Sequence, residues 1–129
     1  MVDLSADEHE FLASMFDLAR GGDLALAGYV DQGLPVNLTN GVGDTLLILA
    51  AYHQHPPLAT ALLERDADHS RVNDRGQTAL AAAVFRQTRE VVERLLRYGA
   101  DPLLGPQSAV DVARFFDLPE MLALLLPVA

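Results

Sequence analysis

Histidines are the residues of this sequence best suited to metal binding or acid–base chemistry. Two of them, His53 and His55, are separated by one residue at an expected turn between helices, where both imidazoles could point the same way. A zinc site needs three or four ligands in a fixed geometry, and no spacing around this pair supplies the others. His9 lies between Glu8 and Glu10 on an expected solvated helix face. We therefore expect no metal and no cofactor. Metal binding or catalysis through His53 and His55 stays an alternative that metal analysis of the purified protein would test.

The segment that comes nearest to a phosphate-binding loop contains Gly41 and Gly43. It lacks the third glycine and the lysine of such loops, and no strand is expected before it. We interpret the two glycines as part of a tight turn that needs positive φ. No Ser–His–Asp order suggests a catalytic triad, and without cysteine there is no thiol nucleophile, zinc thiolate or disulfide. The sequence therefore predicts a protein that is not an enzyme.

Aromatic residues recur at regular intervals, which favours binding over catalysis. Phe85 follows Tyr52 at a spacing of 33, and Phe115 follows Phe85 at a spacing of 30. Tyr, Phe and Arg often anchor protein interfaces, because they bury much surface with few rotamers. Packing of the rings beneath loops is the competing interpretation. With the residues that follow each ring, the candidate contact residues are Tyr52, His53, Phe85, Arg86, Phe115 and Phe116.

Composition and charge narrow the class of protein further. The 129 residues are 50% hydrophobic, which indicates one folded domain rather than disorder. A net charge of −9 would repel a phosphate backbone, so we expect no nucleic-acid partner. The apolar runs at 46–51 and 122–126 are too short to cross a membrane. The acidic N-terminus lacks the order of a signal peptide. We expect a soluble, cytoplasmic protein, and basic residues that are all Arg suggest a GC-rich bacterial source.

These candidate residues are set within an internal repeat. The segment 43–47 recurs as 76–80, and the leucine pair at 62–63 recurs at 95–96, so both recur at a spacing of 33. A last copy begins at Ser108, which follows Thr78 at a spacing of 30. A registered period of this length predicts stacked supersecondary units. We expect one domain, residues 1–129, with approximate units at 5–39, 40–72, 73–105 and 106–129.

Each unit is expected to contain two short helices. In the third unit, Thr78 can cap a helix that runs to Phe85, and Thr88 opens a second helix that Gly99 ends. Asp66 stands where Gly99 would stand in the preceding unit, so we expect an aspartate there with positive φ.

The repeated unit resembles the ankyrin repeat. In the third unit the resemblance is carried by segments 73–80, 82–83, 91–92, 95–96 and 99–101. The Thr-Pro-Leu-His tetrapeptide of the family is nowhere intact, so hydrogen bonds that its histidine supplies between repeats must be replaced by apolar packing or be absent. The resemblance implies an all-α solenoid of about four helix-turn-helix repeats joined by β-hairpin-like loops.

The resemblance also implies a protein–protein interaction module that uses the concave face and the hairpin tips. By repeat position, the candidate tip residues are Val42, Asp44, Asp74, Arg75 and Gln77. The partner protein is not identified by these residues.

The charge is distributed unevenly and leaves an alternative open. Residues 1–68 hold eleven acidic residues and two Arg, whereas residues 69–129 hold seven of each. An acidic inhibitor or immunity-type protein that masks a basic enzyme surface is therefore the first alternative. In the neutral half, Arg75 and Arg86 could meet a carboxylate of a partner. The apolar segment 121–126 is a possible surface for homo-oligomer formation.

Overall fold

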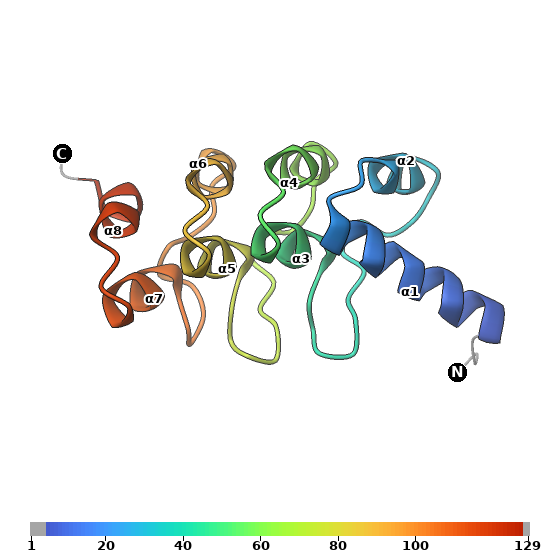
Figure 1. Cartoon of the computed structure of the whole chain (residues 1–129), viewed down its shortest axis with the longest axis horizontal. Helices are drawn as coiled ribbons and strands as arrows, with labels where there is room; N and C mark the ends of the chain where they lie inside the picture. The colour runs from blue at the N-terminus through green and yellow to red at the C-terminus, as the bar shows by residue number, and fades with distance from the viewer. Residues whose placement is uncertain (1–4, 128–129) are drawn as a thin grey trace.

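The structure is a computed structural model that describes residues 5–127, and this part of the chain forms a row of four helix pairs (Figure 1). Helices α1, α3, α5 and α7 form one layer, and α2, α4, α6 and α8 form the other. Within the first layer, α3 packs against α1 and α5, and α5 packs against α7. The bounds are α1 Ala6–Gly21, α2 Ala25–Asp31, α3 Leu46–Tyr52, α4 Pro56–Leu63, α5 Ala79–Phe85, α6 Arg89–Arg97, α7 Ala109–Phe115 and α8 Pro119–Leu125.

Short polar side chains start the helices of the first layer. The hydroxyl oxygens of Thr45, Thr78 and Ser108 accept hydrogen bonds of 3.0–3.1 Å from backbone N–H groups three residues later. Each bond satisfies a donor that the first helical turn leaves without a partner. The predicted cap at Thr78 and the predicted end of its helix at Phe85 are therefore confirmed.

The second helix of each of the first three units ends in the same way. Gly33, Asp66 and Gly99 all have positive φ, of 115°, 64° and 92°. In each case the backbone N–H of this residue and the next one donate to carbonyls near the end of the helix, which is a common helix stop. The left-handed aspartate expected at position 66 is confirmed.

Long loops project from the first layer and join successive pairs. The loop after α2 turns back on itself, with the Asn40 N–H donating to the Asp44 carbonyl at 3.0 Å, and Thr39 and Thr45 form an antiparallel bridge. The next loop has the equivalent bond from Asn73 to Gln77 at 3.0 Å. The expected loops thus follow a hairpin path, although no strand forms among residues 5–127.

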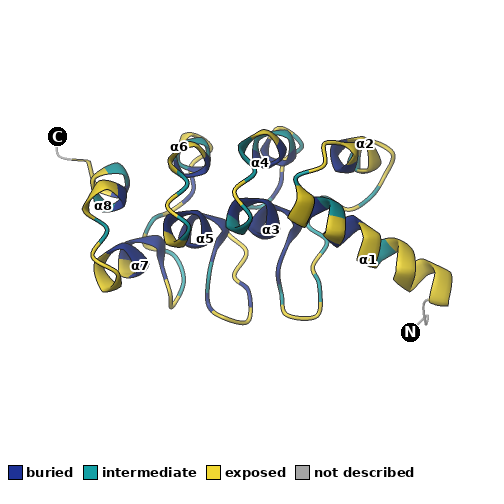
Figure 2. Cartoon of the chain, in the orientation of Figure 1, coloured by how far each residue is buried: buried dark blue, intermediate teal, exposed yellow. Residues whose placement is uncertain are grey.

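The two central helices of the first layer, α3 and α5, are buried almost all round (Figure 2). α5 lies between α3 and α7 and is covered by α6, so its residues from Ala79 to Val84 are all buried. Small alanine side chains let these helices approach closely, and a leucine or valine fills the remaining space. No helix in the described part of the chain is long and apolar enough to span a membrane.

Polar contacts join successive helix pairs. A ring nitrogen of His55, Nε2, lies 2.7 Å from the Arg20 carbonyl oxygen, and the Gln54 amide donates to the Arg86 carbonyl at 3.1 Å. Arg65 donates two hydrogen bonds, of 2.8 and 3.1 Å, to the Asp31 carboxylate. The expectation of apolar packing alone, or of no ties, is therefore wrong. The family's histidine is replaced by polar pairs at other positions.

The ends of the row differ from its middle. α1 has 16 residues, and its first turns are exposed. At the other end Met121 and Leu125 are buried, Leu122 and Leu124 are half-buried, and Leu126 is 40% exposed. Four leucine and methionine side chains of this helix are thus at least half-buried within its own chain, and nothing in the structure supports the expected self-association.

Candidate protein-binding groove

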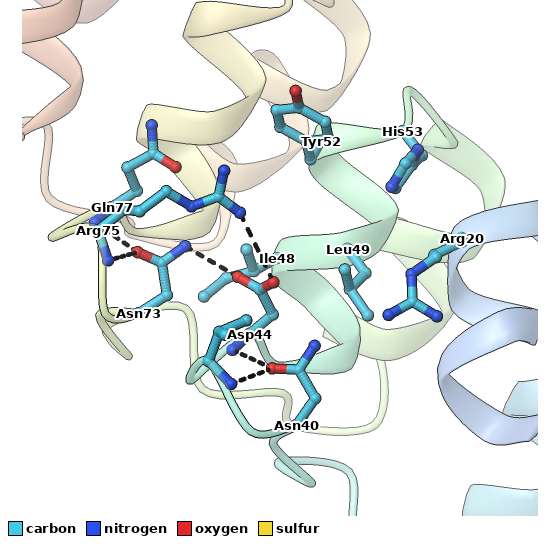
Figure 3. Close-up of a pocket in the computed structure, with 11 residues that line it drawn as sticks. Arg20, Asn40, Asp44, Ile48, Leu49, Tyr52, His53, Asn73, Arg75 and Gln77 are labelled. Atoms are coloured by element: carbon cyan, nitrogen blue, oxygen red, sulfur yellow. Dashed lines mark hydrogen bonds and ion pairs between the residues drawn. The ribbon is translucent and has the colours of Figure 1, made fainter. Parts of the chain in front are cut away.

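A groove runs along the face where the first-layer helices meet the projecting loops. One hollow lies between α1, α3 and the hairpin loops, and its wall includes Arg20, Tyr52, His53 and Arg75 (Figure 3). A second hollow lies further along the row and is lined by Gln77, Phe85, Gln107, Val112, Phe115 and Phe116. Both hollows share Gln77, so we treat them as one surface and call it the groove.

Four aromatic rings form a continuous row on this surface. The Tyr52 and Phe85 rings are stacked, with centroids 6.2 Å apart and planes 10° apart. Phe116 meets Phe85 edge to face at 5.4 Å, and Phe115 meets Phe116 at 4.9 Å. We call these residues, Tyr52, Phe85, Phe116 and Phe115, the aromatic row.

The order of the last two rings differs from the order of equivalent repeat positions. Phe115 holds the helix position equivalent to Tyr52 and Phe85, but Phe116 is the ring that contacts Phe85. One repeat earlier, the residue that follows Phe85 is likewise in contact with the preceding ring: the Arg86 guanidinium carbon lies 5.1 Å from the centre of the Tyr52 ring. In these two repeats, the residue that follows the first-layer helix thus contacts the ring of the preceding repeat. Because α7 belongs to the last helix pair of the described chain, no later residue covers Phe115, and it is 81% exposed.

The exposure of these rings argues against a core role. Phe85 is 39% exposed and Phe116 is 50% exposed, whereas Tyr52 is half-buried and packs against the core. The competing interpretation, in which the rings pack beneath loops, applies in part to Tyr52 only.

Arg86 is held in place from two sides. Besides the contact with the Tyr52 ring, its guanidinium donates to the Gln54 side-chain oxygen at 3.3 Å. Gln54 has positive φ, as does Gln87, its equivalent in the next repeat. Our sequence reasoning missed Gln54, and the repeat spacing of these two glutamines was the available signal.

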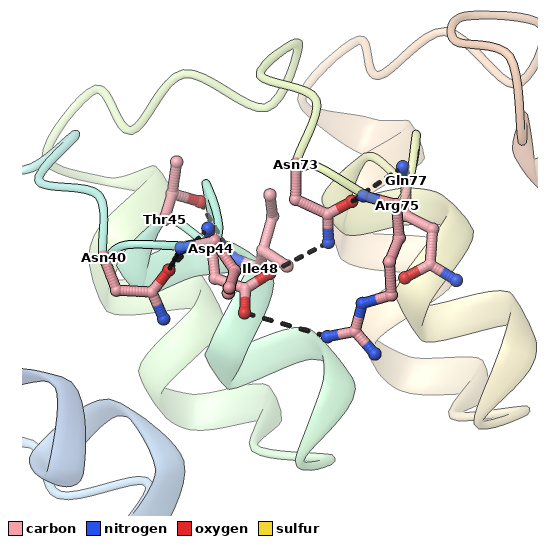
Figure 4. Close-up of polar contacts among 8 residues, drawn as sticks. Asn40, Asp44, Thr45, Ile48, Asn73, Arg75 and Gln77 are labelled. Carbon is pink, nitrogen blue, oxygen red and sulfur yellow. Dashed lines mark hydrogen bonds and ion pairs between the residues drawn. The ribbon is translucent and has the colours of Figure 1, made fainter.

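Four of the five candidate tip residues are accessible, and one is not. Val42 is 51% exposed, Asp74 and Arg75 are exposed, and Gln77 is half-buried. Asp44 is buried, so its prediction as a partner-binding tip residue is wrong. Its carboxylate accepts a hydrogen bond of 2.9 Å from the Asn73 amide and lies 3.9 Å from the Arg75 guanidinium (Figure 4). The hairpin of the next repeat packs against this carboxylate and shields it from solvent.

Two asparagines shape the hairpins that form one wall of the groove. The Asn40 side-chain oxygen accepts from the backbone N–H groups of Val42 and Asp44, at 3.1 and 2.9 Å. The Asn73 oxygen does the same for Arg75 and Gln77, at 3.0 and 2.9 Å. Side-chain to backbone bonds of this kind stabilise turns. Sequence reasoning missed both residues, although their spacing of 33 marks them as equivalent.

The two central histidines have different contacts. His55 lies against the Arg20 carbonyl, whereas the His53 ring meets the Tyr52 ring edge to face at 5.1 Å. Burial lowers the pKa of His53 below its usual value, and the positive charges of His55, Arg20 and Arg86 lower it further, against a small opposing effect of Asp44. Among residues 5–127, no three His, Asp or Glu side chains come together in a way that could hold a metal ion.

The sequence was compared with protein-family models and with known proteins. Residues 15–104 match the family model described as ankyrin repeats (3 copies). The mouse ankyrin repeat and SAM domain-containing protein 6 is 35% identical over 115 residues, which are 87% of this chain and 13% of that protein. An ankyrin repeat protein of Pseudomonas aeruginosa is 48% identical over 54 residues, or 41% of this chain and 32% of that protein. The chain thus spans a small part of the mouse relative and about a third of the bacterial one.

Solved structures agree with the sequence relatives. The crystal structure of the human ASB11 ankyrin repeat domain superposes with a TM-score of 0.76 and 30% identity, covering 86% of this chain and 52% of that chain. The all-α solenoid expected from the sequence period is confirmed by this match and by the family model. The chain belongs to the ankyrin-repeat family.

Proposed function

We propose that this protein binds a partner protein through the groove, and that the aromatic row is the main contact. Ankyrin repeats are protein–protein interaction modules. The observation that supports this site is the continuous set of exposed rings across successive helix pairs, with Phe85, Phe116 and Phe115 exposed by 39, 50 and 81%. Aromatic side chains left in water at a rigid surface favour association, because a partner removes their apolar area from water.

The setting of the rings favours tight contact. Tyr52, Phe85 and Phe115 end helices of the first layer, whose backbone is fixed by burial between neighbouring helices. Ring-to-ring contacts further restrict their rotamers. A surface that is ordered before binding loses little conformational entropy when the partner arrives.

The groove does not favour the alternative of an acidic protein that masks a basic surface. The charged side chains in its wall are Arg20, Arg75 and Asp44, and Asp44, the one acidic residue among them, is buried. The acidic residues of the first helix, Asp7 and Glu8, lie at the far end of the molecule.

A capture experiment with matched variants tests the proposal. The wild-type chain, the double variant Phe85→Ala/Phe116→Ala and the control Tyr98→Ala are immobilised and exposed to an extract of the source cells at low and high salt. Tyr98 is 42% exposed and ends α6 in the other layer, so its loss removes a similar ring away from the groove. We expect proteins retained by the wild type and by Tyr98→Ala to be lost from the double variant. Equal capture by all three folded proteins would contradict the proposal.

A further inference from the structure

The exposed charged residues that line the first hollow are opposite in sign to the net charge of the chain. The chain has a net charge of −9, but the wall of the first hollow contains Arg20 and Arg75 and a single acidic residue, Asp44. Asp44 is buried and already accepts a hydrogen bond from Asn73. Among the residues that line this hollow, the charged side chains exposed to solvent are therefore those of the two arginines.

The two arginines approach the hollow from opposite sides. Arg20 comes from α1, and Arg75 comes from the hairpin loop before α5 (Figure 3). The Arg75 side chain is 64% exposed, and its guanidinium is 3.9 Å from the Asp44 carboxylate, beyond hydrogen-bonding distance. The Arg20 side chain is 43% exposed and donates one hydrogen bond of 3.0 Å to the Asp17 carboxylate, which is itself 75% exposed. Both guanidinium groups keep donors free for an incoming carboxylate, which arginine can bind in a planar, two-point contact.

Apolar and basic parts of the groove lie next to each other. Tyr52 belongs to the wall of the basic hollow, and its ring stacks on Phe85, which lines the second hollow. The residues of the second hollow carry no charge, and they include the exposed rings of Phe115 and Phe116. A ligand that lies along the groove thus meets positive charge first and aromatic surface next.

We propose that the occupant of the groove is an acidic segment of a partner protein in which a carboxylate stands near an aromatic or aliphatic side chain. The acidic side chains of this segment bind Arg75 and Arg20, and the apolar side chain packs on Phe85 and Phe116. This inference rests on the proposed function and names the chemistry of the partner. Charge complementarity with such a segment explains why an acidic chain places two exposed arginines in this hollow.

Selection from a random peptide library displayed on phage tests the chemistry directly, with the immobilised full chain as the target. We expect enriched peptides to combine Asp or Glu with Phe, Tyr, Trp or Leu. Labelled forms of these peptides should bind Arg75→Gln and Arg20→Gln about tenfold more weakly than wild type, as for loss of a hydrogen bond to a charged group. Their affinity should also fall as salt rises.

Arg97→Gln is the matched control, because it removes the same charge from the exposed end of α6 in the other layer. Thermal unfolding of every variant shows whether it is folded, and Arg20→Gln keeps the test decisive if Arg75→Gln is unstable.

The other outcomes overturn the inference in different ways. Enrichment of basic or purely apolar peptides whose binding is lost in Phe85→Ala/Phe116→Ala would refute the acidic partner and leave the protein-binding groove intact. Failure to enrich any groove-dependent peptide would refute the recognition of a linear segment. The capture experiment uses natural folded proteins, so its result decides the proposed function separately.

Discussion

The Asn73 side-chain amide donates a hydrogen bond of 2.9 Å to the buried carboxylate of Asp44, and this bond joins the hairpins of two successive repeats. The Asn73 side-chain oxygen accepts hydrogen bonds from the backbone N–H groups of Arg75 and Gln77 in its own hairpin. One asparagine therefore shapes its own turn and holds the preceding one. Next to this bond, the Asp74 N–H donates to the Val42 carbonyl at 3.0 Å, so the hairpins are joined by backbone as well.

Replacing Asp44 with alanine should destabilise the fold. The change leaves the buried Asn73 amide without its acceptor, and an unsatisfied buried donor costs about 1–3 kcal/mol. Urea unfolding should show a lower midpoint than in the wild type. Asp74→Ala is the control, since Asp74 is exposed in the next hairpin and should change the free energy of unfolding by no more than about 0.5 kcal/mol. Equal stability of both variants would argue against a structural role for Asp44.

The equivalent positions Asp66 and Gly99 should respond in opposite directions to substitution. Both have positive φ, of 64° and 92°, which favours glycine. Gly99→Ala introduces strain worth about 1–2 kcal/mol, and no atom lies close enough to block the added methyl. Asp66→Gly relieves strain and should raise the free energy of unfolding by about 0.5 kcal/mol, after the entropy of the freer unfolded chain is subtracted. Thermal and urea unfolding of the two variants measure both signs, and destabilisation by Asp66→Gly would contradict this account.

Protonation of His53 should lower the stability of the fold at mildly acidic pH. Its pKa in the folded state lies below the usual 6.5, so the folded chain disfavours the protonated form. This residue's contribution to stability is complete above pH 6.5 and is lost as the pH falls from 6.5 through the folded-state pKa. His53→Gln should remove that part of the pH dependence.

The cause of the lowered pKa can be tested at the same residue. Arg20→Gln should raise the pKa of His53 toward 6.5, because one of the nearby positive charges is removed. NMR titration of the histidine rings measures this shift, with Arg97→Gln as the control that should leave it unchanged. A His53 pKa at or above 6.5 in the wild type would contradict the assignment.

Asp31 should titrate below its ordinary value because Arg65 of the next repeat donates to it. Its pKa is lowered from 3.8, with the hydrogen bond from Arg65 as the main cause. The contribution of this pair to stability is therefore present above pH 3.8 and lost as the pH falls through the folded-state pKa. Carboxyl NMR titration should give a midpoint below 3.8 in the wild type and a return toward 3.8 in Arg65→Gln. The contact is exposed, so the effect on total stability should be small.

The repeat and its helices were predictable from the sequence because their signals are local. A threonine cap at Thr78, an apolar stripe and a left-handed stop at Gly99 act within a few residues, and their return at a fixed spacing predicts equivalent units. The equal spacing of Tyr52 and Phe85 also accounts for their contact, since stacked units bring equivalent positions together.

By itself, then, the sequence determined the family, the helix pairs and the face on which the aromatic residues gather. The tertiary structure decided the burial of Asp44 and the contact of Phe116, rather than Phe115, with Phe85. It also decided that Arg20 and Arg75 face one hollow. These outcomes depend on how one repeat leans on the next and on the path of each hairpin. Such contacts join residues of successive repeats that lie far apart in the sequence, and no local propensity encodes them.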